Sequence, residues 1–493
     1  MDYSFKQKII TKFLTNVLGK YTMSIRSRIK EHAKIKSKLI PPLSQLPTSM
    51  KNCSWVDQRL PELLWTVLLA GNLPRELALE CFKNVAGYIS QLQDKEEYSD
   101  ITVSSLAKWS DSIFEGFVRA LIIDPKIANI LGAMLFYNDF PGKDKWIKYL
   151  PPFEDKHIIA LMTAVARCLD HQGQQATDCR WARCLCMIAG GRLQIPQEIL
   201  ESILEYPTNT EESMYSTVRA MEIAMPLEYN DWAKPFWQQN IDRTECCELP
   251  LKIDIKLPMY KINSNEVERV YKSTIEHFHK TQTTCLIDAK HDEIFGATLY
   301  SLSILKELLN IGMSTSITGR IGLRTIVECF LTIAYLIKLN SPEKWSSFRI
   351  YGAGQAKLAS LKIEEGTASP SFITQSYLDA IANEDVWDEF LNIDLGHWDK
   401  SNLRNMSDIA GCKDIYDKYY GWSSTYAHAH WGALRDSVFQ TCGNPLHRLH
   451  RIPRANPRLL PDVIDDAVEV CNKIIDLLKN EYPGIDVSLS RGN

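Results

Sequence analysis

The stretch HWDKSNLRNMSDIAGCKDIYDKYYGWSSTYAHAHWGALRDSVF, residues 397–439, decides how the rest of the chain is interpreted. Its second half contains no proline, and Tyr420, Ser424 and His428 follow one another at four-residue spacing. Arg435 comes seven residues after His428. On a helix of about 3.6 residues per turn these four side chains share one face. A polar face in a helix with apolar flanks needs hydrogen-bonding partners or a ligand, so this stretch predicts a site.

A second polar face lies in a stretch that is otherwise strongly apolar. Arg320, Arg324 and Glu328 are each four residues apart there. If exposed, they form an Arg–Glu ladder worth a few tenths of a kcal/mol, whereas buried charges must be paired and hydrogen-bonded. The sequence leaves both interpretations open. We expect Arg324 and Glu328 to face Ser424 and His428 across a helix–helix contact.

The composition is that of an ordinary soluble protein. The 493 residues suggest two or three domains, and the hydrophobic share of 45% and charged share of 24% are typical of globular chains. A net charge of -4 argues against a protein that coats nucleic acid over its whole surface. The 13 cysteines are scattered through apolar patterns, as in a reducing cytosol. Without a signal peptide or a transmembrane run, a cytoplasmic protein is expected.

Helical periodicity between proline, glycine and serine boundaries predicts an all-α fold. We expect an irregular N-terminal helical domain followed by a C-terminal helical-bundle domain. The predicted boundaries are a basic arm and linker at 1–51, the N-terminal domain at 52–206, a connecting segment at 207–262 and the C-terminal domain at 263–493. KIDIKLPMYKI, residues 252–262, is the one credible strand.

The first 51 residues carry eleven Lys and Arg against only Asp2 and Glu31. Apolar residues recur at helical spacing between 5 and 18, which predicts an amphipathic helix. This arm has three interpretations: docking on the body or on a second subunit, contact with nucleic acid, or an interfacial membrane helix.

Cysteine and histidine spacing predicts no metal site. Cys179, Cys184 and Cys186 do not form paired CxxC units, and no histidine pair follows at zinc-finger spacing. Cys246 and Cys247 are adjacent in an expected loop. The histidines beside glycine, proline or arginine are interpreted as surface loop residues; these are His397, His447 and His450.

An arginine-rich loop follows, with Arg448, Arg451, Arg454 and Arg458 between prolines. Such a loop can contact RNA or DNA phosphates. The alternative is a loop tethered by the acidic residues that come next, Asp462, Asp465 and Asp466.

Three motifs, together with the segment WSSFRIYGAGQAK at 345–357, resemble a bacterial all-helical family of unknown function, whose members often stand near mobile or anti-phage genes. They are Arg-x3-Glu-x6-Tyr-Leu at 324–336, Trp-x-Lys-Ser-x4-Met at 398–406 and Tyr-Asp-x2-Tyr-x3-Ser-x3-His at 416–428. The resemblance covers roughly 263–478. It maps the family's recurring polar positions onto Arg324, Glu328, Tyr416, Ser424 and His428.

That family is distantly similar to HEPN domains, which include ribonucleases and toxins with an Arg-x4-6-His motif. The motif itself is absent, because Arg435 is followed by no histidine before His447, and only three residues separate Arg167 from His171. A composite site can pair an arginine of one helix with His428 of another.

The resemblance therefore implies an anti-phage defence or toxin effector acting as a metal-independent endoribonuclease without a cofactor. The expected catalytic residues are His428, Arg324, Glu328, Ser424 and Tyr420, and the expected substrate-binding residues are Arg320, Arg435 and Tyr416. RNA or another nucleic acid, a second copy of the chain and a protein from the same operon are the expected partners. The alternative is a non-catalytic sensor, adaptor or scaffold subunit in which the same residues only specify helix packing.

Overall fold

The computed structural model describes residues 29–36, 38–40, 54–208, 212–227, 232–248, 262–310, 312–448 and 450–490. Helices make up 65% of the chain, and the described residues contain only two small two-stranded sheets, which confirms the all-α prediction. None of the described helices is long and apolar enough to cross a bilayer. The predicted helix at 5–18 and nearly all of the predicted strand at 252–262 lie outside the described residues.

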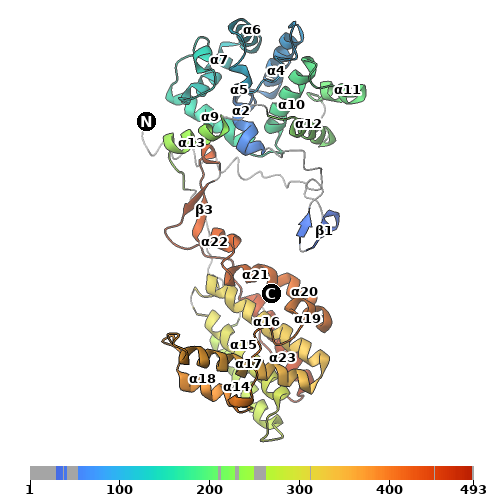
Figure 1. Cartoon of the computed structure of the whole chain (residues 1–493), viewed down its shortest axis with the longest axis vertical. Coiled ribbons are helices and arrows are strands. Elements are labelled where there is room, and N and C mark those ends of the chain that lie inside the picture. Colours follow the sequence, from blue (N-terminus) through green and yellow to red (C-terminus); the bar gives the residue numbers. More distant parts are fainter. Residues whose placement is uncertain are drawn as a thin grey trace. The chain divides into compact units, whose positions relative to one another are not determined.

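The chain divides into two compact units, which Figure 1 colours by sequence. Unit 1 comprises Met1–Leu251 and Thr441–Ile452, and unit 2 comprises Lys252–Gln440 and Pro453–Asn493. The segment 441–452, expected in the C-terminal bundle, therefore packs within unit 1. Two helices of the expected connecting segment 207–262 also contribute core residues to unit 1, among them Val218 and Phe236.

The elements of unit 1 run in the order η1 (Ile29–Glu31), β1 (Ala33–Ile35), β2 (Lys38–Ile40), η3 (Trp55–Arg59), α2 (Leu60–Glu62), α3 (Leu64–Asn72), α4 (Arg75–Ser90), α5 (Val103–Leu106), α6 (Asp111–Leu121), α7 (Pro125–Leu131), η4 (Gly132–Phe136), α8 (Lys143–Trp146), α9 (Asp155–Cys168), α10 (Gln174–Ala189), α11 (Gln197–Glu205), α12 (Glu212–Ala224), α13 (Ala233–Arg243) and η7 (Pro445–His447). Proline residues and side-chain caps determine where several of these helices begin. Asp124 accepts a hydrogen bond from the backbone N–H of Lys126 and Pro125 opens α7, the arrangement that satisfies or removes the free donors of a first turn.

Helix α3 lies at the centre of unit 1 and is buried on all sides by α4, α7, α9 and α10. Trp65 of α3 packs edge-on against Phe82 and Phe117, with ring centroids 5.7 and 5.5 Å apart. Gly71 allows the close approach of α9, because a Cβ there would lie 2.3 Å from the Cα of Ala164. An apolar, uncharged helix of this kind is typical of a core element.

A buried ionic cluster fixes the end of α12 to α10 and η3. Glu222 lies 2.5 Å from Arg59, 2.9 Å from Arg183 and 3.5 Å from Arg180, and all four side chains are essentially inaccessible. Arg183 also contacts Asp100 at 3.1 Å. Because removing one partner would leave a buried charge uncompensated, the cluster ties these elements together.

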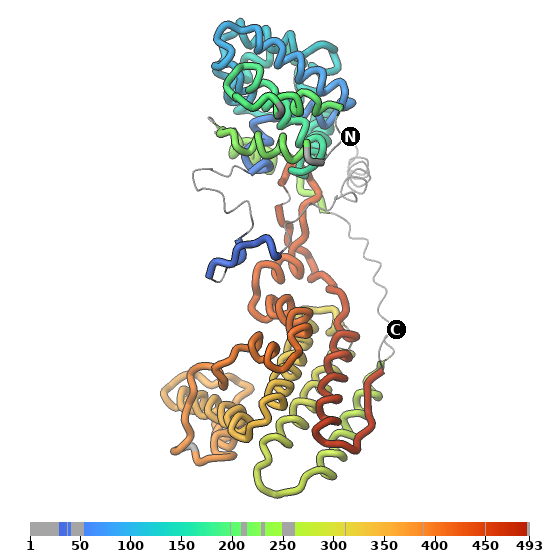
Figure 2. The backbone as a smooth tube through the Cα atoms, turned by 90° about the vertical axis from the view of Figure 1, so that its right-hand side faces the viewer, coloured from blue at the N-terminus to red at the C-terminus, as the bar shows by residue number. Residues whose placement is uncertain are grey.

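The elements of unit 2 are α14 (Ser264–Thr281), α15 (Ala289–Leu308), α16 (Ile317–Leu339), α17 (Pro342–Glu364), α18 (Gln375–Ala382), η5 (Asp388–Phe390), α19 (Leu403–Ala410), α20 (Lys413–Ile415), η6 (Tyr416–Tyr420), α21 (Gly421–Ala427), α22 (Trp431–Val438) and α23 (Ile464–Glu481). The boundaries between the two units fall within the paired strands β3 (Phe439–Thr441) and β4 (Arg451–Pro453). Helix α16 is central and packs against α15, α19, α21 and α23. Figure 2 follows the long helices of this bundle as neighbouring tubes.

Helix α16 owes its length to clear signals at both ends. The Ser316 hydroxyl accepts a hydrogen bond from the backbone N–H of Gly319, and Asn340 closes the helix in the left-handed conformation at φ 47°. Leu323, Ile326 and Phe330 face the core that α15 and α23 complete.

The four strands differ from the sequence interpretation, which placed the only credible strand at 252–262. β1 pairs antiparallel with β2, and β3 pairs with β4. Each strand has three residues, too short to show the period-two alternation by which strands are recognised in sequence.

Candidate functional site

Helix α16 presents the predicted ladder along its partly exposed side. Arg324 Nη2 lies 2.9 Å from Glu328 Oε1, and the two side chains are 17% and 28% exposed. The pair is therefore an intrahelical ion pair at four-residue spacing, only partly exposed, and Arg320, the third member of the predicted ladder, is buried apart from it.

Arg324 also reaches the π-helical turn η6. Its Nη2 lies 3.3 Å from Tyr420 Oη, and its guanidinium carbon lies 5.3 Å from the centre of that ring. Tyr420 stacks on Tyr416 with ring centroids 4.9 Å apart and an angle of 20°. Burial, and then the neighbouring Tyr420, raise the pKa of Tyr416. One continuous row of contacts thus joins four predicted site residues: Glu328 contacts Arg324, Arg324 contacts Tyr420, and Tyr420 contacts Tyr416.

Arg320 is held by the protein backbone rather than presented to solvent. It donates hydrogen bonds to the carbonyls of Ser314 at 3.5 Å and Pro461 at 2.5 Å, and its guanidinium lies 5.9 Å from the Tyr426 ring centre. Burial lowers the pKa of Arg320, although Tyr426 and Asp436 favour its charged form. Such a side chain positions the loop before α23 and has few donors left for a substrate.

The expected continuous helix through Tyr420, Ser424, His428 and Arg435 is not formed. α21 ends at Ala427, His428 is its C-cap, and Ala429 follows with a φ of 49°. Arg435 therefore belongs to a separate helix, α22, and is exposed. The reason is local: a left-handed residue reverses the chain direction, and here alanine rather than glycine adopts that conformation.

His428 is exposed beyond the end of α21, and its ring stacks on that of His430 with centroids 5.8 Å apart. Ser424 is half-buried on α21, and its carbonyl accepts the backbone N–H of His428 at 3.2 Å. Although α16 and α21 pack together, no hydrogen bond, ion pair or ring contact within the described part of unit 2 joins Arg324 or Glu328 to these two side chains. The predicted site is thus divided into a row on α16 and η6 and a turn after α21.

Large aromatic side chains lie exposed on both sides of this turn. Trp422 of α21 is 57% exposed and Trp431 of α22 is 59% exposed. Trp422 packs edge-on against Tyr426, and Trp431 packs against Phe439 with the two rings tilted by 43°. We name the set Trp422, His428, His430, Trp431 and Arg435 the α21–α22 surface. Exposed tryptophan rings that neighbouring rings hold in place can stack on flat rings of a ligand, and the adjacent histidines and arginine suit a ligand with negative charge.

Three of the four arginines of the arginine-rich loop bind partners other than the expected acidic residues. Arg458 pairs with Asp436 at 2.6 Å, which itself accepts a hydrogen bond from Tyr426 Oη at 2.9 Å. Arg454 Nε donates to the Phe439 carbonyl at 3.0 Å, and Arg448 pairs with Asp57. These three partners, Asp436, Phe439 and Asp57, all precede the loop in sequence.

The sequence interpretation also missed a group of sulfur and nitrogen atoms in unit 1. His447 was expected on the surface but is 5% exposed, and it lies with Cys246, Cys442 and His450. Cys442-x4-His447-x2-His450 was a local signal, but the fourth member stands almost two hundred residues earlier, which no short motif search connects.

One segment of the chain matches a known protein family. Residues 297–444 match a family described as a family of unknown function (DUF5677). No curated protein and no solved structure matches the chain. Arg324, Glu328, Tyr420 and His428 all lie inside the matched segment. Over these residues, which include most of unit 2, the chain is thus similar to an uncharacterised family.

Proposed function

We propose that this chain is a defence- or toxin-type effector that binds and cleaves RNA, and that the α21–α22 surface is its reaction centre. The observation that supports this proposal best is the pair of exposed, stacked imidazoles at His428 and His430, which Trp422 and Trp431 accompany. The defence or toxin setting comes from the resemblance of the sequence alone.

Substrate binding is proposed to rely on stacking and on one guanidinium. Unstacked RNA bases pack on exposed aromatic rings, with about 1–3 kcal/mol per base. Arg435 lies one turn along α22 from Trp431, and its guanidinium can donate two parallel hydrogen bonds to a backbone phosphate. The overall charge of -4 makes a local surface of this kind more suitable than a protein-wide basic coat.

The proposed reaction needs only two proton carriers. One imidazole, His428, takes the proton of a ribose 2′-hydroxyl as its oxygen attacks the adjacent phosphorus. The bond from phosphorus to the 5′-oxygen breaks, and His430 gives that leaving oxygen a proton. A 2′,3′-cyclic phosphate and a 5′-hydroxyl result. Imidazoles can accept and release protons near neutral pH, so the step needs no metal ion.

In this proposal the row Arg324, Glu328, Tyr420 and Tyr416 supports the surface instead of touching the phosphate. Arg324 is already paired with Glu328 and Tyr420. Because the side chain of Arg324 already has partners within the protein, this pairing also favours the second candidate function. This is a non-catalytic adaptor whose polar residues specify packing only.

The test is cleavage of a labelled single-stranded RNA by the purified full chain without added divalent metal. His428→Ala is compared with His279→Ala, a matched change at an exposed histidine of α14. We expect the wild type and His279→Ala to leave 2′,3′-cyclic phosphate ends and His428→Ala to be inactive at an unchanged melting temperature. RNA that is bound but not cut by the wild type would favour the adaptor, and equal cleavage by both variants would refute the role of His428.

A further inference from the structure

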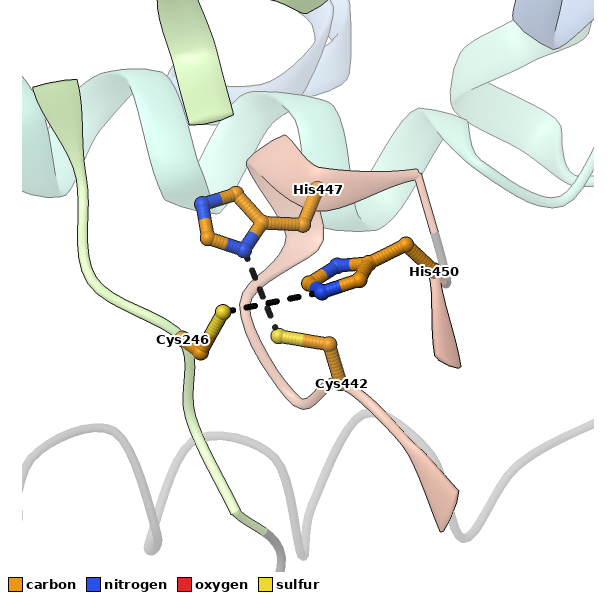
Figure 3. A group of neighbouring side chains, drawn as sticks. All are labelled: Cys246, Cys442, His447 and His450. Atoms are coloured by element: carbon orange, nitrogen blue, oxygen red, sulfur yellow. Dashed lines mark hydrogen bonds between the residues drawn. The ribbon is translucent and has the colours of Figure 1, made fainter. Parts of the chain in front are cut away.

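Four metal-ligating side chains converge in unit 1, and Figure 3 shows them pointing toward one common space. One ligand atom from each of Cys246, Cys442, His447 and His450 lies within 4.8 Å of all the others. Cys246 Sγ is 3.5 Å from His450 Nε2, and Cys442 Sγ is 3.4 Å from His447 Nδ1. All four residues belong to unit 1, although three of them follow most of unit 2 in sequence.

These separations fit a tetrahedral zinc site. With Zn–S bonds of about 2.3 Å and Zn–N bonds of about 2.0–2.1 Å, ligand atoms of such a site lie about 3.3–3.8 Å apart. The two measured S···N distances fall in that range. The remaining separations, all within 4.8 Å, need to close by about 1.5 Å or less to complete the tetrahedron. Two thiols and two imidazoles are soft and borderline donors, which suit zinc and not calcium or magnesium.

The backbone brings three of the ligands together within a short turn. Cys442 N–H donates to the His450 carbonyl at 2.8 Å, which closes the loop between them. Asn444 caps η7 by accepting from Leu446 N–H at 3.0 Å, and Leu446 is fully buried in the core of unit 1. Because η7 packs on α9 and α13, His447 is fixed in position before any ion binds.

The sulfur of Cys442 lies among backbone N–H donors. Its Sγ accepts backbone N–H groups from Cys247 at 3.3 Å and from Asn444 at 3.4 Å. A thiol that only fills space has no need of two donors, whereas a metal-bound thiolate is stabilised by them. The Cys247 contact also aligns the segment that carries Cys246, since Gly443 N–H donates to the Cys247 carbonyl at 2.7 Å.

His447 is oriented so that Nδ1 presents a lone pair to the group. The Thr244 hydroxyl donates to the Asn240 carbonyl at 2.7 Å, so its oxygen is left as an acceptor. That oxygen lies 2.9 Å from His447 Nε2, and with the hydroxyl proton directed at Asn240 this ring nitrogen is the donor of the pair. A ligating imidazole whose other nitrogen donates to a fixed acceptor is the usual outer-shell arrangement of metal sites.

We propose that Cys246, Cys442, His447 and His450 bind one zinc ion. Four protein ligands leave no open position, so the site is structural and fastens the segment 441–452 to the chain that follows α13. Only Cys442 of the four falls inside the segment that matches the uncharacterised family. The proposal is independent of the α21–α22 surface, none of whose residues takes part.

Zinc content of the purified full chain tests this proposal. Elemental analysis after extensive dialysis should give about one zinc per chain in the wild type and nearly none in Cys246→Ser, a change at an exposed side chain that need not disturb the core. The control is Cys247→Ser, which changes the adjacent thiol but keeps the backbone N–H and should retain the zinc. Cobalt in place of zinc should give the visible absorption of a tetrahedral site with two sulfur ligands.

Two further measurements keep the outcome decisive if a variant folds poorly. A strong chelator should lower the melting temperature of the wild type, and added zinc should restore it, while Cys246→Ser should respond to neither. Wild-type protein purified with zinc present but holding much less than one ion per chain would overturn the proposal. So would equal zinc loss in Cys247→Ser, or a disulfide between Cys246 and Cys442 in protein kept under reducing conditions.

Discussion

Arg324 and Tyr420 are joined twice, by a contact of 3.3 Å between Nη2 and Oη and by the approach of the guanidinium to 5.3 Å from the ring centre. If this contact is structural, Tyr420→Phe should lower the free energy of unfolding by about 0.5–1.5 kcal/mol, because it removes the hydroxyl and keeps the ring. Urea unfolding measures the change. Tyr300→Phe, at an exposed tyrosine of α15, is the control and should be neutral. Unchanged stability with weaker RNA binding would instead place Tyr420 in the binding surface.

We expect Glu222→Gln to be among the most damaging single substitutions in unit 1. It leaves Arg59, Arg180 and Arg183 with less countercharge in a site that water does not reach. Breaking a buried pair in this way costs about 3–5 kcal/mol. Glu115→Gln removes an exposed pair with Arg119 and should change stability by about 0.5 kcal/mol or less. Comparable losses in the two variants, measured by chemical unfolding, would contradict the role given to the buried cluster.

Stability should depend on pH through Glu62. Burial, opposed by hydrogen bonds from Ser104 and supported by the nearby Asp100, raises the pKa of this carboxyl from 4.5 to about 7. Between these values the folded protein keeps a proton that the unfolded chain has lost. The free energy of unfolding therefore falls as the pH rises from 4.5 to about 7, by on the order of 2–3 kcal/mol from this group. Thermal unfolding measured across this pH window should show stability falling with pH in the wild type and falling less steeply in Glu62→Gln. An identical pH dependence in the two proteins would contradict the raised pKa of Glu62.

Single-stranded RNA binding should depend on the two exposed tryptophans of the α21–α22 surface. Loss of one stacking ring costs about 1–3 kcal/mol, so Trp422→Ala and Trp431→Ala should each weaken binding roughly 5- to 150-fold. Trp387→Ala removes a similarly exposed ring elsewhere in unit 2 and serves as the control. Fluorescence anisotropy with a labelled oligoribonucleotide gives the three dissociation constants. An equal affinity of all variants would exclude this surface as the RNA site.

The helices were predictable where local chemistry sets their limits. Asp124 and Pro125 open α7 with a side-chain acceptor and a residue that lacks an N–H, and both properties are visible in sequence. The Arg324–Glu328 pair follows directly from helix periodicity. The break at Ala429 could not be predicted in this way, since alanine favours helix and the left-handed conformation it adopts here, at a φ of 49°, is the one that glycine usually supplies.

Contacts between segments that are far apart in sequence could not be predicted either. Arg180 and Arg183 are spaced like residues of an exposed helix face, and only Glu222 and Asp100, far away in sequence, explain their burial. The same holds for Cys246 and its three companions. Short motifs record neighbours along a helix or turn, whereas these sites depend on which distant segments the core brings together.

The return of the segment 441–452 to unit 1 has a consequence for folding during synthesis. Gly443 and Cys442 bind Cys247, which leaves the ribosome 195 residues earlier, and Leu446 completes a core begun by the first helices. At about 5–20 residues per second, that interval lasts about 10–40 s. Throughout it the early helices leave uncovered the apolar surface that Leu446 will fill. Until the segment 441–452 emerges, this part of the unit 1 core therefore stays exposed to water and to other chains.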